Sequence, residues 1–171
     1  NLGGIVATTL IARKIINPRG IILASPVFQA IISSFQKTQI LFGSAFFPQA
    51  TVPNGIPLDY LSRDKRVVID YQTDPLKHDK VSARMAKFIV EAGKECIAAV
   101  GNWQKPTLIL LPKNDYLVDS KGTEMFYHNA PKDVVKMHIY ENLYHEVFNE
   151  IGKEGEKVLA DLKNWILDQI D

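Results

Sequence analysis

The chain has 171 residues, and its composition of 46% hydrophobic and 23% charged residues predicts one folded domain and excludes a disordered protein. Twenty basic and nineteen acidic residues leave a net charge of +1 with no long basic run, which argues against nucleic acid as a partner. The single cysteine, Cys96, excludes an internal disulfide framework, and no apolar run reaches the roughly 20 residues that span a bilayer, so we expect the protein in the cytoplasm or at a membrane surface.

The first predicted element is a helix at the start of the chain, where the glycine pair at 3–4 leads directly into an apolar segment. A turn over 17–20 separates this helix from a short apolar run over 20–25, which is typical of a buried strand. A helix followed by a strand is half of a βαβ unit, and a parallel strand before Asn1 would complete it. We therefore expect the chain to begin within a motif.

The long segment 27–100 has a different character. It is rich in Phe, Ile, Gln and Ser, is interrupted by prolines, and lacks the alternation of a strand, so we predict helices and loops inserted between two core strands. Its large apolar residues leave two interpretations open: they pack the segment onto the core, or they form a lipid-binding wall. The residues in question are Phe28, Ile31, Ile32, Phe35, Leu41, Phe42, Phe46 and Phe47.

The alternation of strand and helix resumes after this segment. We predict a strand over 107–111, a helix over 120–129 with Asp119 as its N-cap, and a strand over 134–140. A final helix over 155–170 should lie against the sheet, because its apolar residues recur on one face. Those residues are Val158, Leu159, Leu162, Trp165, Ile166 and Ile170. The order of elements predicts an α/β fold with a parallel sheet.

An acid and an imidazole follow two of the predicted strands. Asp115 comes after the strand that starts at Thr107, and His145 comes after the next one. The carboxyl ends of parallel strands meet at one edge of a sheet, which favours a catalytic pair there. Each residue alone also has a simpler interpretation, since Asp is common in turns and a loop histidine can bond a neighbouring glutamate.

The start of the chain is a candidate for the matching nucleophile. In the elbow pattern Gly-x-Ser-x-Gly, the nucleophile stands two residues before the second glycine, and that position is Asn1. Asparagine has no ionisable hydroxyl or thiol, but the backbone N–H of Leu2 would be placed to donate to an oxyanion. The alternative is a helix that begins with a glycine pair for close packing. The order residue 1, Asp115, His145 is that of nucleophile, acid and base in α/β-hydrolases.

The remaining histidines and the cysteine give no sign of a second site. His78, His128 and His138 lack metal-ligand spacing with one another or with a cysteine, and we predict no metal site and no cofactor. Cys96 lies in a helical context without an evident base, which favours a packed thiol over a nucleophile.

Five stretches of the sequence resemble one known family. They are Leu61–Leu76, Lys80–Arg84, Leu108–Asp119 around the acid, Tyr140–Glu146 around the histidine, and Leu23–Pro26, which resembles the strand end that enters the cap. Together they are similar to the monoacylglycerol lipase and lysophospholipase branch of the α/β-hydrolases. The first stretch is the most specific, because it resembles the cap segment of that branch.

The resemblance implies a serine hydrolase that cleaves the ester of a single-chain lipid, such as a monoacylglycerol or lysophospholipid. Residues 1–171 would form a partial α/β-hydrolase domain, with 27–100 as a helical cap that makes an acyl tunnel. By position, Asp115 matches the acid, His145 the base and Leu2 the oxyanion donor. The chain departs from the family at Asn1, where the family has serine.

The same resemblance places the first five strands of the family's sheet before the start of this chain. We expect them from a preceding segment of the same chain or from another chain. Two other functions stay open: a catalytically inactive lipid-binding or interaction module, which the asparagine favours, and an esterase or peptidase with another acyl substrate. The apolar cap also predicts transient contact with a membrane surface.

Overall fold

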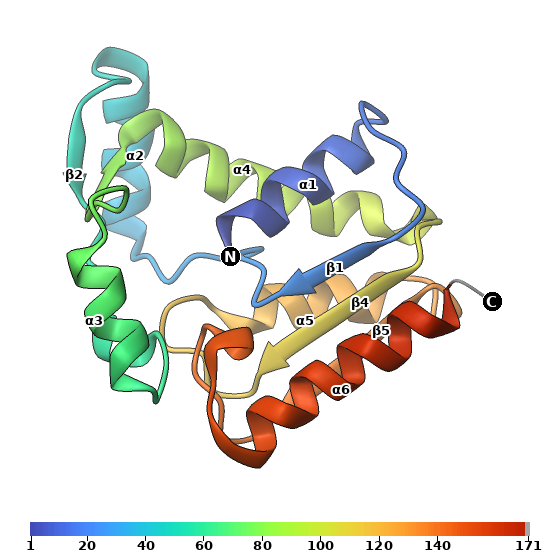
Figure 1. Cartoon of the computed structure of the whole chain (residues 1–171). Helices are drawn as coiled ribbons and strands as arrows, with labels where there is room; N and C mark the ends of the chain where they lie inside the picture. Colours follow the sequence, from blue (N-terminus) through green and yellow to red (C-terminus); the bar gives the residue numbers. More distant parts are fainter. Residues whose placement is uncertain (170–171) are drawn as a thin grey trace.

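The computed structural model describes residues 1–169, which form a parallel sheet between two layers of helices (Figure 1). The sheet of the described residues has three strands, β1 (Ile21–Ala24), β4 (Thr107–Pro112) and β5 (Val135–Tyr140), in the order β1-β4-β5. Both pairings are parallel. The loops that follow the strands therefore gather at one edge of the sheet.

The central strand β4 explains why the sheet needs cover on both faces. Each of its six residues is buried. Ile109 and Leu111 belong to one core cluster, whereas Leu108 and Leu110 belong to the other, as the two-residue period of a strand requires. A continuous apolar run in a parallel sheet is buried on both sides, which agrees with the predicted α/β fold.

Three helices cover one face and one helix covers the other. Helices α1 (Leu2–Ala12), α4 (Ala83–Ala99) and α5 (Ser120–Asn129) supply residues to the first cluster. Helix α6 (Gly152–Asp168) supplies Val158 and Trp165 to the second cluster. Figure 1 shows α6 on the opposite side of the sheet from α1 and α4.

The predicted elements outside the middle segment are confirmed, with one correction in α6. Asp119 caps α5 by accepting a hydrogen bond from the Lys121 N–H at 3.1 Å. Helix α6 begins at 152 rather than 155, and not all of its apolar residues face the sheet. Leu159 and Ile166 are 54% and 37% exposed, because each lies about 100° around the helix from a buried neighbour. Ile170 lies outside the described residues.

The middle segment 27–100 contains the predicted helices and a small sheet that the sequence analysis missed. Besides α4 it forms α2 (Ser34–Phe46) and α3 (Lys65–Thr73). Strands β2 (Thr51–Pro53) and β3 (Lys80–Ser82) pair antiparallel, apart from the main sheet. Strands of three residues are too short to show alternation, and a proline in one of them hides it further. Short 3₁₀ turns complete the described elements at Leu58–Tyr60, Val100–Asn102 and Val147–Asn149.

The backbone at Phe28 is wedged between two helices. A Cβ atom added at Gly93 of α4 would lie 2.1 Å from the Phe28 carbonyl oxygen, and one at Gly122 of α5 would lie 2.6 Å from the Gln29 Cβ. Both helices can approach this segment so closely only because each has a glycine there. The Phe28 ring stacks on Phe126 with 4.6 Å between ring centroids.

The apolar residues of 27–100 thus fall into two groups. Phe28 packs onto the core and is 3% exposed, as the first interpretation predicts. Helix α2 has no buried residue, and its aromatic and aliphatic side chains remain on the surface. The exposed residues are Phe35, Leu41, Phe42, Phe46 and Phe47, with Ile31 just before the helix. Among residues 1–169, no helix combines the length and apolarity needed to cross a membrane.

Candidate active site

The Asp115 side chain is buried in the loop after the carboxyl end of β4, with one carboxylate oxygen held by the main chain. Its Oδ1 atom accepts hydrogen bonds from the N–H groups of Leu117 and Val118 at 2.8 and 3.2 Å. Its side chain is 0% exposed. These two donors fix the carboxylate and leave Oδ2 for a single further partner.

That partner is His145, in the loop after β5. Its Nδ1 atom lies 2.7 Å from Asp115 Oδ2, and the imidazole is 5% exposed. Because an ionised carboxylate can only accept, Nδ1–H is the donor of the hydrogen bond to Asp115 Oδ2. The ring orientation is thereby set, and Nε2 points away from the acid toward residue 1.

Asn1 lies directly before α1, and its side chain faces the histidine. The Oδ1 atom of Asn1 is 2.7 Å from His145 Nε2. The backbone nitrogen of Asn1 lies 3.0 Å from the Ala24 carbonyl oxygen, which places residue 1 beside the end of β1. The structure therefore brings together the three residues that the sequence analysis proposed as a set.

The amide of Asn1 also bonds a second acid. Its Nδ2 atom donates to Glu146 Oε1 at 3.1 Å, so the carbonyl end of the amide is the one that faces Nε2. Asn1 therefore presents an acceptor to Nε2, whereas a hydroxyl at residue 1 could donate to that nitrogen.

Leu2 is the first residue of α1, as the oxyanion prediction requires. The first N–H groups of a helix have no acceptor within the helix, and the helix dipole favours negative charge there. Its backbone thus has the position of a donor, while the Leu2 side chain is 40% exposed and faces away from the core.

Residues from the middle segment hold the loop that carries His145. The His145 N–H donates to the Tyr60 carbonyl at 3.4 Å, and the Glu146 N–H donates to the Leu61 carbonyl at 2.8 Å. On the other side, Ser25 Oγ donates to the His145 carbonyl at 2.6 Å. Ser25 is fully buried and adopts a positive φ of 44°, a conformation that costs free energy and needs support from its surroundings.

A buried glutamate links the same two segments a few residues further on. Glu150 accepts hydrogen bonds from the N–H groups of Arg63 and Tyr144 at 3.2 and 3.0 Å. Its other oxygen pairs with Arg63 Nε at 2.8 Å, and the Glu150 side chain is 0% exposed. Ser62 Oγ adds a bond to the Asn149 carbonyl at 2.9 Å. Residues 58–64, which we call the docked segment, are therefore fastened to the histidine loop.

The sequence analysis missed these supporting residues. The stretch from Leu61 has the most specific family resemblance, but that resemblance assigns no role to Arg63. Glu150 gave no signal at all, because a single glutamate near a helix start is usually solvated. A cluster of three tyrosines, two of them next to Asp115 and His145 in the sequence, was also missed: the Tyr60 ring lies 4.4 Å from Tyr116 and 5.7 Å from Tyr144, centroid to centroid.

The remaining candidates lie away from this site. Cys96 is buried in the core beside Thr9, with 3.4 Å between Sγ and Oγ1, and burial raises the pKa of its thiol, as expected for a packed cysteine. His138 approaches Asp161 at 3.6 Å. Residues 1–169 contain no group of three or more His, Cys, Asp or Glu side chains able to hold a metal ion.

Comparison with known proteins gives matches over most of the chain. The family model Hydrolase_4, described as serine aminopeptidase S33, matches residues 1–152. A monoacylglycerol lipase of Mycolicibacterium smegmatis is 31% identical over 122 residues, which are 68% of this chain and 43% of that protein. A monoglyceride lipase of Rattus norvegicus is 27% identical over 175 residues, covering 99% of this chain and 57% of that protein.

A solved structure gives the same result for the fold. The crystal structure of the Paleococcus ferrophilus monoacylglycerol lipase superposes with a TM-score of 0.90 at 19% identity, over 97% of this chain and 65% of that one. The chain thus spans less than two thirds of the length of each of these three proteins.

Proposed function

From the premise that the chain belongs to the Hydrolase_4 family, described as serine aminopeptidase S33, we propose that it has the catalytic architecture of a carboxylic-ester hydrolase for single-chain lipids. Its fold is that of the α/β-hydrolases, and the two relatives described above are named as lipases. The proposed substrates are monoacylglycerols or lysophospholipids, whose single acyl chain suits a cap with many apolar residues.

One observation carries the proposal: the Asp115 carboxylate orients the His145 ring, and Nε2 of that ring is aimed at residue 1 across 2.7 Å. In the proposed roles Asp115 is the acid, His145 the general base and residue 1 the nucleophile position. A hydroxyl at residue 1 would lose its proton to Nε2 as it attacks the ester carbonyl, and Nε2 would return the proton to the departing alcohol. The Leu2 N–H would donate to the oxyanion.

The asparagine at residue 1 favours a second function. A carboxamide cannot form the acyl intermediate of a serine hydrolase, and Asn1 occupies Nε2 with a hydrogen bond. Loss of one member of a triad lowers the turnover rate by roughly 10⁴-fold or more. With Asn1 in place the chain would be a catalytically inactive member of its family that binds lipid or a partner.

Labelling with a fluorophosphonate probe tests both functions. The Asn1→Ser chain should be labelled, and the label should be lost in the matched Asn1→Ser/His145→Ala chain, because the probe needs a nucleophile activated by the base. The unchanged chain should stay unlabelled. If the Asn1→Ser chain folds together with the rest of its α/β-hydrolase domain but never labels, the assignment of Asp115 and His145 as acid and base is wrong. Labelling of the unchanged chain would overturn the inactive alternative.

The acyl preference is a separate measurement on the Asn1→Ser chain. Rates with p-nitrophenyl esters should rise from acetate to medium and long chains, because an apolar cap binds a longer acyl chain more tightly. A preference for acetate would favour the small-ester esterase or peptidase instead. Exposed Phe46 and Phe47 at the end of α2 are the proposed point of transient contact with a membrane surface.

A further inference from the structure

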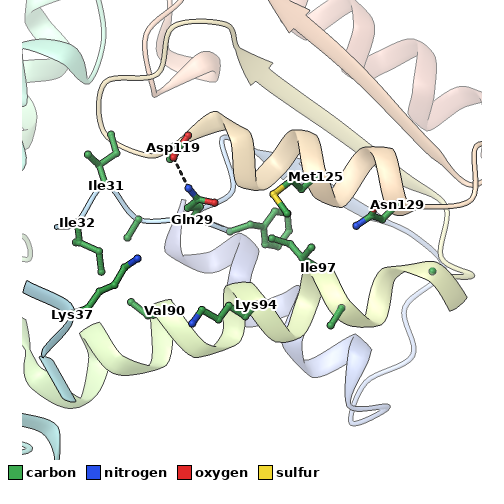
Figure 2. Close-up of a pocket in the computed structure, with 14 residues that line it drawn as sticks. Gln29, Ile31, Ile32, Lys37, Val90, Lys94, Ile97, Asp119, Met125 and Asn129 are labelled. Carbon is green, nitrogen blue, oxygen red and sulfur yellow. Dashed lines mark hydrogen bonds between the residues drawn. The ribbon is translucent and has the colours of Figure 1, made fainter. Parts of the chain in front are cut away.

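A large groove lies apart from the candidate active site. It has a volume of about 770 Å³ and runs between the 28–32 segment, α2, α4 and α5 (Figure 2). None of Asn1, Asp115 and His145 lines it. The residues that line the groove are therefore different from those of the candidate active site.

The lining of the groove is mainly apolar. Buried Phe28, half-buried Ile97 and 49% exposed Met125 lie along it, and Ile31 and Ile32 stand at one end. Pockets for small molecules have volumes of roughly 300 to 1,000 Å³ with mostly apolar walls and a few polar groups. The volume and the walls suit one acyl chain.

Two lysines stand on one side of the groove, from different helices. Figure 2 shows Lys37 and Lys94 beside Val90, with Gln29 and Asp119 across from them. Lys37 is the one charged residue of α2. Among residues 1–169, neither lysine takes part in an ion pair.

The acids near these lysines already have partners. On α4, Glu91 pairs with Lys87 at 2.8 Å and Glu95 pairs with Arg13 at 2.7 Å. Across the groove, the Asp119 carboxylate accepts hydrogen bonds from Gln29 Nε2 and from the Lys121 N–H. The hydrogen-bond partners of Asp119 are neutral, so the groove lining holds two ammonium groups against one carboxylate. This net positive charge beside an apolar wall is complementary to an anionic amphiphile.

We infer that the groove is a binding site for a free fatty acid, with the carboxylate at Lys37 and Lys94 and the acyl chain along Ile97 and Met125. The two ammonium groups supply charge-assisted hydrogen bonds to the carboxylate, and the walls bury the chain. Such an acid is also a product of the proposed hydrolysis, although its recognition here uses none of the residues of the candidate active site.

Equilibrium binding of dodecanoate below its micellar concentration tests the inference, with 1-dodecanol as the uncharged probe of equal chain length. In the Lys37→Met/Lys94→Met chain the affinity for dodecanoate should fall at least roughly tenfold, since two charge-assisted contacts are lost, while the affinity for dodecanol should stay the same. Lys163→Met, an exposed lysine of α6 on the other face of the sheet, is the matched control and should change neither.

A second variant tests the apolar wall. Ala98→Phe fills the groove and should weaken dodecanoate and dodecanol alike. The inference is wrong if the affinity for dodecanoate is unchanged in both the lysine variant and Ala98→Phe. It is also wrong if the lysine variant loses affinity for dodecanoate and dodecanol equally. The fluorophosphonate assay is independent of this measurement. If the chain fails to label but binds dodecanoate through the lysines, the proposed hydrolase function is contradicted and the fatty-acid site is still supported.

Discussion

The docked segment and helix α2 belong to the same stretch of sequence, 27–100, but they relate to the rest of the molecule in opposite ways. In the docked segment, Leu61 is 3% exposed and Ser62 is fully buried, and the main chain bonds the histidine loop. Helix α2 has 13 residues and none of them is buried. Most of its apolar side chains, namely Phe35, Leu41, Phe42 and Phe46, are more than half exposed and gain little from intramolecular burial.

The difference teaches that the predicted cap is not uniform. Its docked segment acts on the candidate active site from the outside, because it fixes the backbone on either side of His145 and so the direction of Nε2. Its α2 part carries an exposed apolar surface, which we propose as the site of association with a membrane. Substitutions in the two parts should therefore change different properties, stability in the first and association in the second.

The largest effect should come from Glu150→Ala, which removes the acceptor that joins the docked segment to the histidine loop. The N–H groups of Arg63 and Tyr144 would lose their partner, and we expect the free energy of unfolding to fall by about 3 kcal/mol. Urea denaturation measures this. Glu141→Ala is the matched control, because Glu141 pairs with Lys113 in an exposed ion pair and its loss should cost no more than about 1 kcal/mol. Equal effects of the two changes would contradict the role given to the buried glutamate.

A matched pair of leucines compares the two parts directly. Leu61→Ala should lower the free energy of unfolding by roughly 2 to 3 kcal/mol, since it leaves a cavity in the docked segment. Leu41→Ala on α2, where the side chain is 56% exposed, should change it by less than about 0.5 kcal/mol. Urea denaturation measures both changes. A large decrease in the free energy of unfolding from Leu41→Ala would mean that α2 is packed against the rest of the chain.

The smallest effect on stability, but a clear one on association, is expected for Phe46→Asp/Phe47→Asp. Sedimentation with phosphatidylcholine vesicles should show at least a roughly tenfold loss of bound protein, because two exposed aromatic rings no longer enter the interface. Leu159→Asp/Leu167→Asp on α6 is the control, with side chains 54% and 49% exposed on the other side of the sheet. Binding that falls equally in both variants would point to general surface hydrophobicity rather than to α2.

The sequence predicts those parts of the fold that carry strong local signals. β4 is an unbroken apolar run between prolines and polar residues, and Asp119 is a good N-cap in front of a helical pattern. Asp115 and His145 follow from the same logic, because parallel strands deliver the residues after them to one edge. The pairing of β4 with β5 brings the two loops together, and the hydrogen bonds of each loop then set the 2.7 Å contact.

The supporting residues depend on contacts that no local pattern encodes. Arg63 and Glu150 are 87 positions apart, and each looks like an ordinary surface charge until the two segments meet. The positive φ of Ser25 is equally invisible, because serine has no preference for it and the surroundings impose it. Strands β2 and β3 could not be predicted for a different reason, because three residues are too few to show the alternation of a strand.

The glycine contacts at Phe28 make the fatty-acid groove a good template for directed evolution. Because Gly93 and Gly122 meet the main chain at Phe28 and Gln29, the spacing of α4 and α5 is set by backbone against backbone. A library at positions 94, 97, 98 and 125 would vary the chemistry of the lining at constant width. Alanine at either glycine would clash with this main chain and displace α4 or α5 from it. These two positions should therefore be kept as glycine while new ligands are selected.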